Sequence, residues 1–263
     1  MIERIEDAND PRIEAYRDIR ERDLKGRAGA FVLEGEIVLK AALRAGRFTV
    51  GSLLIGENRL EPLAELLAQV PVTVPVYVAG RAALDAIAGF PLHRGVLALG
   101  LRGEPKSPAE LVAGLPAQAL VMVLSAIANH DNMGGLFRNA AAFGVDAVLL
   151  DEGCCDPLYR KAIRVSAGAA VIVPFAQGGT AQTLCEHLLA AGFSVLATSP
   201  RGTRRLKAVM GSPRQAVLFG AEGPGLPQAL IDRLDSVRID MAGGFDSLNV
   251  ATTAGIVLHQ LRG

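Results

Sequence analysis

Short apolar runs alternate with amphipathic segments along the second half of the chain. The runs predict strands at 119–125, 147–150, 170–173, 194–198, 216–220 and 237–239. Between the strands, apolar residues at helical spacing predict helices at 133–143, 158–167, 181–191, 226–234 and 247–261. Strands that are apolar on both faces and alternate with helices are typical of a parallel sheet with helices on both sides. Ligands bind such sheets beyond the carboxyl ends of the strands, so the loops that follow the strands are the candidate sites.

The first part of the chain has a similar but less regular alternation. It predicts strands at 31–35, 48–55, 72–78 and 95–101, and helices at 36–45, 60–70 and 81–88, after a charged helix at 13–24. A segment with three prolines separates the two parts. We therefore expect a small α/β domain at 1–102, a linker with a helical turn at 103–117, and a parallel-sheet domain at 118–263.

Composition narrows the class of protein further. Half of the 263 residues are apolar, and 27 basic residues balance 27 acidic ones, which excludes a wholly disordered chain. No apolar run is long enough to cross a bilayer, and the polar first residues do not resemble a secretory signal. Three cysteines and four scattered histidines lack the spacing of disulfide frameworks or metal ligands. We expect a cytoplasmic protein with no membrane segment and no metal.

The first candidate loop leads into the helix predicted at 133–143. Asn132 stands where a helix N-cap is expected, and two adjacent glycines, Gly134 and Gly135, follow it. Glycines this early in a helix cost about 1–2 kcal/mol relative to alanine, so we expect another segment to approach this backbone closely. Arg138 lies off the apolar face of the helix, where it is either a solvent-facing charge or a functional group.

The second candidate loop, at 217–227, follows an apolar strand. It holds three glycines and Glu222 within six residues. The glycines allow positive φ and leave backbone N–H and C=O groups bare, which favours a ligand loop over a plain strand–helix connection.

The third candidate loop lies within 237–261. A strand ends in a Gly-Gly loop, after which Asp246 or Ser247 is expected to cap a long amphipathic helix. Ser247 and Asn249 would then lie in the first helical turn, where free N–H groups attract carboxylate or phosphate. A plain helix cap would also explain Ser247 without any function.

Together the three segments resemble, in order and spacing, the signature motifs of the SpoU (TrmH-like) branch of the SPOUT superfamily of RNA methyltransferases. The first motif is matched by Asn132, Gly134, Arg138 and 140–144, the second by 219–225, and the third by 239–250. The segment 154–169 is similar to the stretch between the first two motifs. A shorter match at 31–43 resembles the substrate-binding domain that precedes the catalytic domain in several members. Asp240 departs from the family pattern, because a proline is common there.

The resemblance implies a particular fold and assembly. The C-terminal parallel-sheet domain would contain a trefoil knot of the SPOUT type, preceded by a small α/β L30e-like substrate-binding domain. Family members are usually homodimers through the C-terminal domain, with the active site completed across the subunit interface. The general rule that chains avoid knots would not predict this topology.

The resemblance also implies methyl transfer from S-adenosylmethionine to a ribose 2′-hydroxyl of RNA. Arg138 would hold a phosphate and stabilise negative charge on the hydroxyl oxygen, because a guanidinium stays protonated and so is a poor base for the hydroxyl proton. The hydroxyl, Arg138 and the cofactor would be positioned by Asn132, Glu222, Ser247 and Asn249. The residues expected to contact S-adenosylmethionine are Thr198, Gly220, Ile239, Met241 and Leu248.

Two basic clusters are candidates for RNA contact, and each is equally compatible with a solvated surface. They are Arg160, Lys161 and Arg164, and the segment containing Arg204 and Arg205. The resemblance favours ribosomal RNA over transfer RNA as substrate. A tRNA methyltransferase, a non-catalytic RNA-binding protein of the same fold, and a metabolic enzyme with an adenine-containing cofactor are the alternatives.

Overall fold

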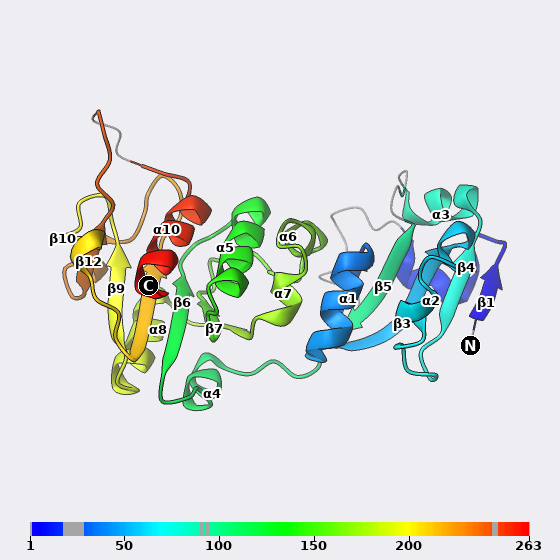
Figure 1. Cartoon of the computed structure of the whole chain (residues 1–263), viewed down its shortest axis with the longest axis horizontal. Helices are drawn as coiled ribbons and strands as arrows, with labels where there is room; N and C mark the ends of the chain where they lie inside the picture. The colour runs from blue at the N-terminus through cyan, green and yellow to red at the C-terminus, as the bar shows by residue number, and fades with distance from the viewer. Residues whose placement is uncertain (1, 18–28, 90–91, 93–94, 244–246, 263) are drawn as a thin grey trace. The chain divides into compact units, whose positions relative to one another are not determined.

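The computed structural model describes residues 2–17, 29–89, 92, 95–243 and 247–262. The chain divides into two compact units, each with its own sheet (Figure 1). The first unit is formed by Met1–Glu104 together with Leu158–Ile172, and the second by Pro105–Pro157 together with Val173–Gly263. The segment 158–172 thus clusters with the first unit, although it lies inside the domain predicted at 118–263. Most of the segment predicted as a linker belongs to the second unit.

The first unit contains a mixed five-stranded sheet in the order β1-β4-β3-β5-β2. Its strands are β1 (Ile2–Ile5), β2 (Ala30–Glu34), β3 (Thr49–Gly56), β4 (Val76–Ala79) and β5 (Val96–Leu101). β4 runs parallel to β1 and β3, whereas β5 runs antiparallel to β2 and β3. Its helices are η1 (Pro11–Tyr16), α1 (Glu36–Ala45), η3 (Glu57–Arg59), α2 (Ala64–Leu67), α3 (Arg81–Ala88), α6 (Arg160–Val165) and α7 (Ala169–Ile172).

The predicted helices at 36–45 and 81–88 are confirmed with the same bounds. The helix predicted at 60–70 is wrong in extent, because only α2 is α-helical and Pro62 cannot continue a helix that starts before it. The helix predicted at 13–24 begins as the 3-10 helix η1, and 18–24 lies outside the described residues. The sequence pattern missed strand β1 altogether.

The strand predicted at 170–173 is also wrong, since this segment is helix α7. The hydroxyl of Ser166 accepts a hydrogen bond from the backbone N–H of Ala170, at 3.2 Å, within the first turn of α7. Gly168 ends the preceding segment with φ +88°. The strand forms two residues further on, as β8 (Phe175–Gln177).

The second unit contains a seven-stranded sheet in the order β10-β12-β9-β11-β6-β7-β8, with every neighbouring pair parallel. Its other strands are β6 (Ala119–Leu124), β7 (Ala147–Leu150), β9 (Ser194–Thr198), β10 (Arg204–Arg205), β11 (Arg214–Phe219) and β12 (Asp235–Arg238). Its helices are α4 (Pro108–Ala113), α5 (His130–Ala142), α8 (Ala181–Ala190), η4 (Leu206–Ala208), α9 (Gln228–Ile231) and α10 (Val250–Arg262). The predicted parallel sheet is confirmed.

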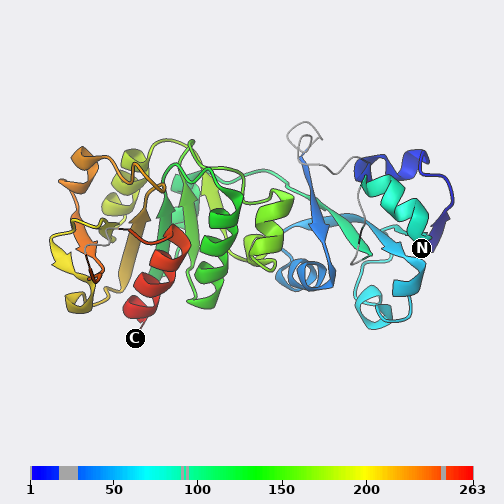
Figure 2. The ribbon, with the colours of Figure 1, turned by 90° about the horizontal axis from the view of Figure 1, so that it is seen from above.

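Helices cover both faces of this second sheet, as the fully apolar strands predicted (Figure 2). One face forms a core with α4, α8 and α9, in which Val121, Val123 and Leu218 pack with Leu184 and Leu230. Helices α5 and α10 lie side by side on the other face. Successive side chains of β6 point to opposite faces of the sheet. Because helices cover both faces, all six residues of this strand are buried.

Strand β12 lies between β9 and β10, although β9 and β10 are consecutive along the chain. The connection at 199–203 therefore crosses the end of β12. A Cβ atom on Gly202 would lie 2.3 Å from the carbonyl carbon of Val237 and 2.7 Å from the backbone nitrogen of Arg238. Only a glycine allows the two backbones to approach this closely.

Within the described ranges, no helix is both long and apolar enough to span a bilayer. The same residues contain no group of three or more His, Cys, Asp or Glu side chains arranged to hold a metal ion.

Candidate functional site

Helices α5 and α10 run parallel and begin at the same edge of the sheet. A Cβ atom on Gly135 would lie 2.7 Å from the Cβ of Ala251, and the Asn139 side-chain amide donates to the carbonyl of Ala251 at 2.6 Å. Further along both helices, the rings of Phe143 and His259 meet edge to face at 6.0 Å. The expectation that another segment approaches the glycines of α5 is therefore confirmed, and that segment is the last helix.

Helix α5 begins at His130, three residues before the predicted start at 133. Asn129 is its N-cap, and its side-chain oxygen accepts from the N–H groups of Asp131 and Asn132 at 2.7 and 3.2 Å. The prediction that Asn132 caps this helix is wrong. Since Asn129 serves the helix start, the buried side chain of Asn132 is available for a contact with another element.

Helix α10 is capped by Asn249 rather than by Ser247. The Asn249 side-chain oxygen accepts from the N–H groups of Ala251 and Thr252 at 2.9 and 3.2 Å. Ser247 and Asn249 both precede the helix, so their predicted position in its first turn is wrong. The other predicted cap, Asp246, lies outside the described residues. Asparagine is as good a cap as serine or aspartate, which is why the sequence pattern did not distinguish them.

Asn249 also joins the three predicted loops. Its side-chain nitrogen donates to the side-chain oxygen of Asn132 at 2.8 Å and to Oε1 of Glu222 at 2.7 Å. The N–H of Val250 approaches the same Glu222 oxygen at 3.4 Å, so the carboxylate lies at the positive end of α10. We call Asn132, Glu222 and Asn249 the three-motif junction. Its amide orientations are fixed, because both hydrogens and the oxygen of Asn249 have partners.

The glycine loop that presents Glu222 closes on itself. A Cβ atom on Gly220 would lie 2.7 Å from the carbonyl carbon of Gly225 and 2.8 Å from the nitrogen of Leu226. The N–H of Gly225 donates to the carbonyl of Ala221 at 3.1 Å, and Gly225 has φ +66°. The glycines therefore shape a tight bend that leaves the Glu222 side chain exposed at its tip.

The residues predicted to contact a cofactor gather at the carboxyl edge of β9, β11 and β12. These strands are adjacent and parallel, so their ends meet at one place. The Thr198 hydroxyl at the end of β9 donates to the carbonyl of Leu218 at 2.9 Å. The side chains of the remaining apolar candidates are half-buried or exposed; they are Ile239, Met241 and Leu248.

A charged cluster lies beside these strand ends. Arg238 donates from Nη1 to the carbonyl of Gly202 at 2.6 Å, which fastens the 199–203 connection to β12. The Asp240 carboxylate lies 3.7 Å from Nε of Arg238 and 3.6 Å from Nε of Arg205. Arg204 pairs with Asp235 at 3.3 Å. The unusual Asp240 is therefore paired with arginines, including one of the predicted RNA contacts.

The predicted arginines divide between the two units. Arg138 is exposed on α5, and within the described residues it makes no hydrogen bond or ion pair, including with the three-motif junction. Helix α6 in the first unit holds Arg160, whose Nη1 lies 2.7 Å from Oε2 of the buried Glu34. Arg164 lies 3.9 Å from the same oxygen, and Lys161 is half-buried on the same helix. The ion pair with Glu34 favours a structural role for Arg160.

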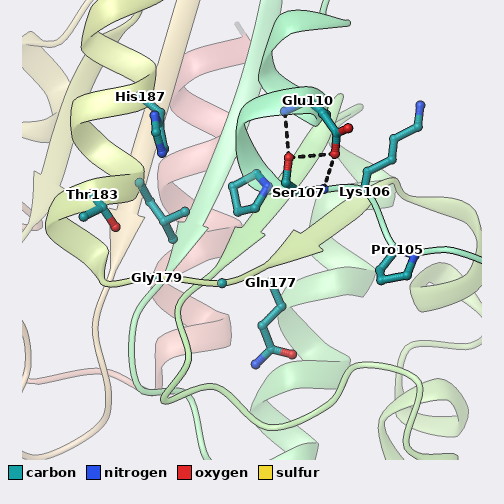
Figure 3. A pocket seen from close by; sticks show the side chains of 11 residues that line it. Pro105, Lys106, Ser107, Glu110, Gln177, Gly179, Thr183 and His187 are labelled. Carbon is teal, nitrogen blue, oxygen red and sulfur yellow. Dashed lines mark hydrogen bonds between the residues drawn. The ribbon is translucent and has the colours of Figure 1, made fainter.

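A cavity of about 430 Å³ lies elsewhere in the second unit, between α4, the end of β8 and α8 (Figure 3). Lys106, Thr183 and His187 line it, together with Glu110, whose carboxylate accepts from the backbone and hydroxyl of Ser107. None of the predicted site residues lines this cavity. The candidate site is therefore the carboxyl edge of the sheet and not this cavity.

The fold and the site define a class of protein: an α/β protein whose parallel sheet carries three polar, glycine-containing loops at one carboxyl edge. Residues 119–259 match the model of the SpoU rRNA Methylase family. The chain belongs to this family of RNA methyltransferases, and the resemblance inferred from the three motifs is confirmed.

Relatives and solved structures agree with this assignment. A protein of Mycobacterium tuberculosis described as an uncharacterized tRNA/rRNA methyltransferase is 40% identical over 97% of this chain and 89% of its own length. The Bacillus subtilis 23S rRNA (guanosine(2553)-2′-O)-methyltransferase RlmP is 24% identical over the whole of both chains. An AdoMet-bound rRNA methyltransferase of Sinorhizobium meliloti has a similar fold, with a TM-score of 0.82 at 22% identity, over 98% of this chain and 97% of its own.

Proposed function

We propose that this protein transfers a methyl group from S-adenosylmethionine to a ribose 2′-hydroxyl of ribosomal RNA in the cytoplasm. The observation that carries the proposal is the three-motif junction, in which one polar residue from each family motif is held by hydrogen bonds of 2.7 and 2.8 Å. Family membership and the rRNA substrate named for the Bacillus subtilis relative support the reaction and the substrate class.

The residues at the ends of β9, β11 and β12 fit S-adenosylmethionine. Main-chain groups of the bend after Gly220 would pair with an adenine edge, while the half-buried Ile239 and the partly exposed Leu248 would offer apolar contact to a ring. When bound there, S-adenosylmethionine supplies an activated methyl group on a positively charged sulfur. Thr198 and Met241 complete the proposed binding set.

The polar residues of the site would orient the RNA hydroxyl. Glu222 and Asn249 present exposed side chains at the sheet edge, and their mutual hydrogen bond fixes them before substrate binds, which lowers the cost of orientation. Ser247, two residues before the α10 cap, is exposed and would add a hydroxyl to this set. Arg138 would hold the neighbouring phosphate and stabilise negative charge on the attacking oxygen.

A homodimer would complete this site. Arg138 is exposed and unconnected to the junction within the described part of its own chain, and an active site shared between two subunits accounts for that separation. Exposed apolar Ile256 on α10 supports an interface on this face of the second unit. Analytical ultracentrifugation tests the proposal: a monomer at micromolar concentration contradicts it.

The finer features of the fold are part of the same proposal. The position of β12 between β9 and β10, with 199–203 crossing it, supports a trefoil knot in the second unit. The first unit, with the segment around Phe31, would be the L30e-like RNA substrate-binding domain. Arg204, Arg205 and Arg164 are exposed and would contact RNA phosphates, so RNA affinity should fall steeply as salt rises.

A methyl-transfer assay tests the function. Purified protein is incubated with S-adenosylmethionine labelled in its methyl group and with either ribosomal or transfer RNA, and 2′-O-methylation is mapped by sequencing. One labelled ribose in ribosomal RNA is expected. Label confined to transfer RNA would show that transfer RNA is the substrate. Label on a base, or on no RNA, would contradict the proposed reaction.

Arg138→Ala tests the role of the arginine within that assay. We expect turnover to fall about 100-fold or more while the Kd for S-adenosylmethionine stays nearly unchanged, because the guanidinium acts on the RNA and not on the cofactor. Arg138→Lys is the matched control and should retain part of the activity, since it keeps the charge but loses the planar fork. Normal turnover in Arg138→Ala would remove this residue from the reaction.

A further inference from the structure

A buried carboxylate lies outside the three-motif junction. Asp151 directly follows β7, and only 8% of its surface is exposed. Its Oδ2 accepts from the Ser125 hydroxyl at 2.7 Å, and its Oδ1 accepts from the N–H groups of Ala126 and Gly153, both at 3.0 Å. Hydrogen bonds from these three donors offset the cost of burying this polar side chain.

The group that Asp151 holds most directly is a strained residue. Ala126 has φ +56°, a left-handed conformation that costs an alanine about 1–2 kcal/mol. Its methyl group is exposed, so side-chain packing does not enforce this conformation. The preceding residue is fixed as well, because the N–H of Ser125 donates to the carbonyl of Phe219 at 2.9 Å. The hydrogen bond from Ala126 to Asp151 therefore acts on the strained residue itself, while the N–H of Ile127, the next residue, donates to Sγ of Cys154 at 3.4 Å.

The strained turn leads without a break to the start of α5. The carbonyl of Ile127 accepts from the N–H of Cys155 at 2.8 Å. The loop after β7 is therefore also hydrogen-bonded to the residue that follows Ala126. Asn129, two residues on, caps α5, and Asn132 in its first turn enters the junction. We call Ser125, Ala126, Asp151 and Gly153 the Asp151 clamp.

We propose that Asp151 is a positioning residue for methyl transfer: it holds Ala126 in its left-handed turn, so that α5 starts where Asn132 can meet Asn249. This inference rests on the proposed function for its effect on turnover. Asp151 touches neither substrate nor cofactor in this scheme. The cofactor residues follow β9, β11 and β12, on the other side of the sheet edge, and so they should be affected much less.

Asp151→Asn is the first test. Asparagine has the same shape, but one carboxylate oxygen is replaced by an NH2 group, which is a donor. That NH2 group would face one of the donors that Asp151 accepts from, so at least one hydrogen bond is lost. We expect turnover to fall about 10-fold, with the Kd for S-adenosylmethionine within about twofold of the wild type. Ser125→Ala removes one bond of the clamp and should cause a smaller fall of the same kind, which keeps the test informative if Asp151→Asn folds poorly. A parallel loss of turnover and cofactor affinity would overturn the proposal.

Rescue by glycine separates positioning from general packing. Glycine adopts positive φ without strain. Adding Ala126→Gly to Asp151→Asn should therefore raise turnover about threefold or more above that of Asp151→Asn alone. Ala167→Gly is the matched control, because Ala167 is the other described non-glycine residue with positive φ, at +52°, and it lies in the first unit. Equal rescue by both glycines, or by neither, would overturn the proposal.

Thermal unfolding without RNA keeps this test separate from the proposed function. Asp151→Asn should lower the Tm, and Ala126→Gly but not Ala167→Gly should recover part of the loss. If the wild-type protein methylates no RNA, the proposed function fails while the unfolding cycle still decides whether Asp151 holds the turn. A cycle in which the two glycines recover the Tm equally would contradict the clamp.

Discussion

The two halves of the carboxyl edge of the second sheet are built in different ways. At β6, β7 and β8, side chains tie the loops together: Asp151 accepts from Ser125, and the Gln177 amide donates to the carbonyl of Cys154 at 2.8 Å. At β9, β11 and β12, backbone meets backbone, since Gly202 and Gly220 allow approaches that a Cβ atom would block. The first half is held by polar side chains, whereas the second combines side-chain ties from Thr198 and Arg238 with backbone contacts that only glycine allows.

The difference matches the task proposed for each half. A helix that must place Asn132 within hydrogen-bond distance of another element needs a fixed starting point, and buried side-chain hydrogen bonds supply it. A cofactor that is recognised by main-chain groups needs bare backbone, and side-chain ties would cover it. The three-motif junction lies where the two halves meet. The predictions below test this comparison between the two halves.

The largest expected effect is on the glycine-shaped half. Gly202→Ala would place a methyl group within 2.3 Å of the Val237 backbone and should lower the free energy of unfolding by about 3 kcal/mol. Gly114→Ala is the control, because its nearest contact is an ordinary 3.7 Å and its φ is −84°. Chemical denaturation measures both. Similar values for the two variants would show that the crossing at 199–203 is not tightly packed.

The next effect compares the caps of the two helices that begin at this edge. Asn129→Ala removes only a cap and should cost about 1 kcal/mol. Asn249→Ala also leaves the buried oxygen of Asn132 without its donor, so it should cost about 2 kcal/mol and lower turnover more. Denaturation and the methyl-transfer assay measure the two losses. Equal losses in both variants would mean that the junction contributes nothing beyond capping.

A smaller effect concerns the charges beside the cofactor strands. Asp240→Asn breaks exposed ion pairs with Arg205 and Arg238, so stability should change by less than about 0.5 kcal/mol. RNA affinity should rise about twofold at low salt, because the arginines lose their anionic partner, and the gain should vanish at high salt. Titration at two salt concentrations measures it, and a gain independent of salt would contradict the electrostatic reason.

The smallest effect is expected from the thiols of the polar half and its flanking helix. Burial raises the pKa of Cys154 to about 12, and the pKa values of Cys155 and Cys185 to about 11. All three therefore remain protonated near neutral pH and should react slowly with iodoacetamide at pH 8, until the protein is unfolded. Because folding raises these pKa values, the stability they contribute is intact below about pH 9 and is lost as the pH rises towards 11–12. Rapid labelling of the folded protein would contradict this burial.

Much of the fold could be predicted from the sequence, because local patterns decide it. Strands at 147–150 and 194–198 and the helix at 36–45 have the bounds that apolar spacing predicts. The segment 170–173 is different: its apolar run predicts a strand, but the Ser166 hydroxyl and the turn at Gly168 start helix α7 there. Such side-chain contacts do not change the apolar pattern.

The three residues that meet at the junction were among those that the sequence motifs indicated, but their hydrogen bonds could not be predicted. The motifs identify Asn132, Glu222 and Asn249, but several Asn, Asp and Ser residues near each helix start are equally good caps. Which of them caps depends on where the other helix lies, and Asn132 and Asn249 are 117 residues apart. Asp151 was missed because a lone aspartate after a strand has no distinctive sequence signal.

The separation of the junction residues along the chain has a consequence for synthesis. Two of them belong to segments made well before the third, and Asn249 acquires its orientation only when the helix that it caps has formed. A polypeptide that ends before α10 would therefore contain every strand of the second sheet and still lack the three-motif junction. The polar centre proposed for methyl transfer would be complete only once the final helix is present.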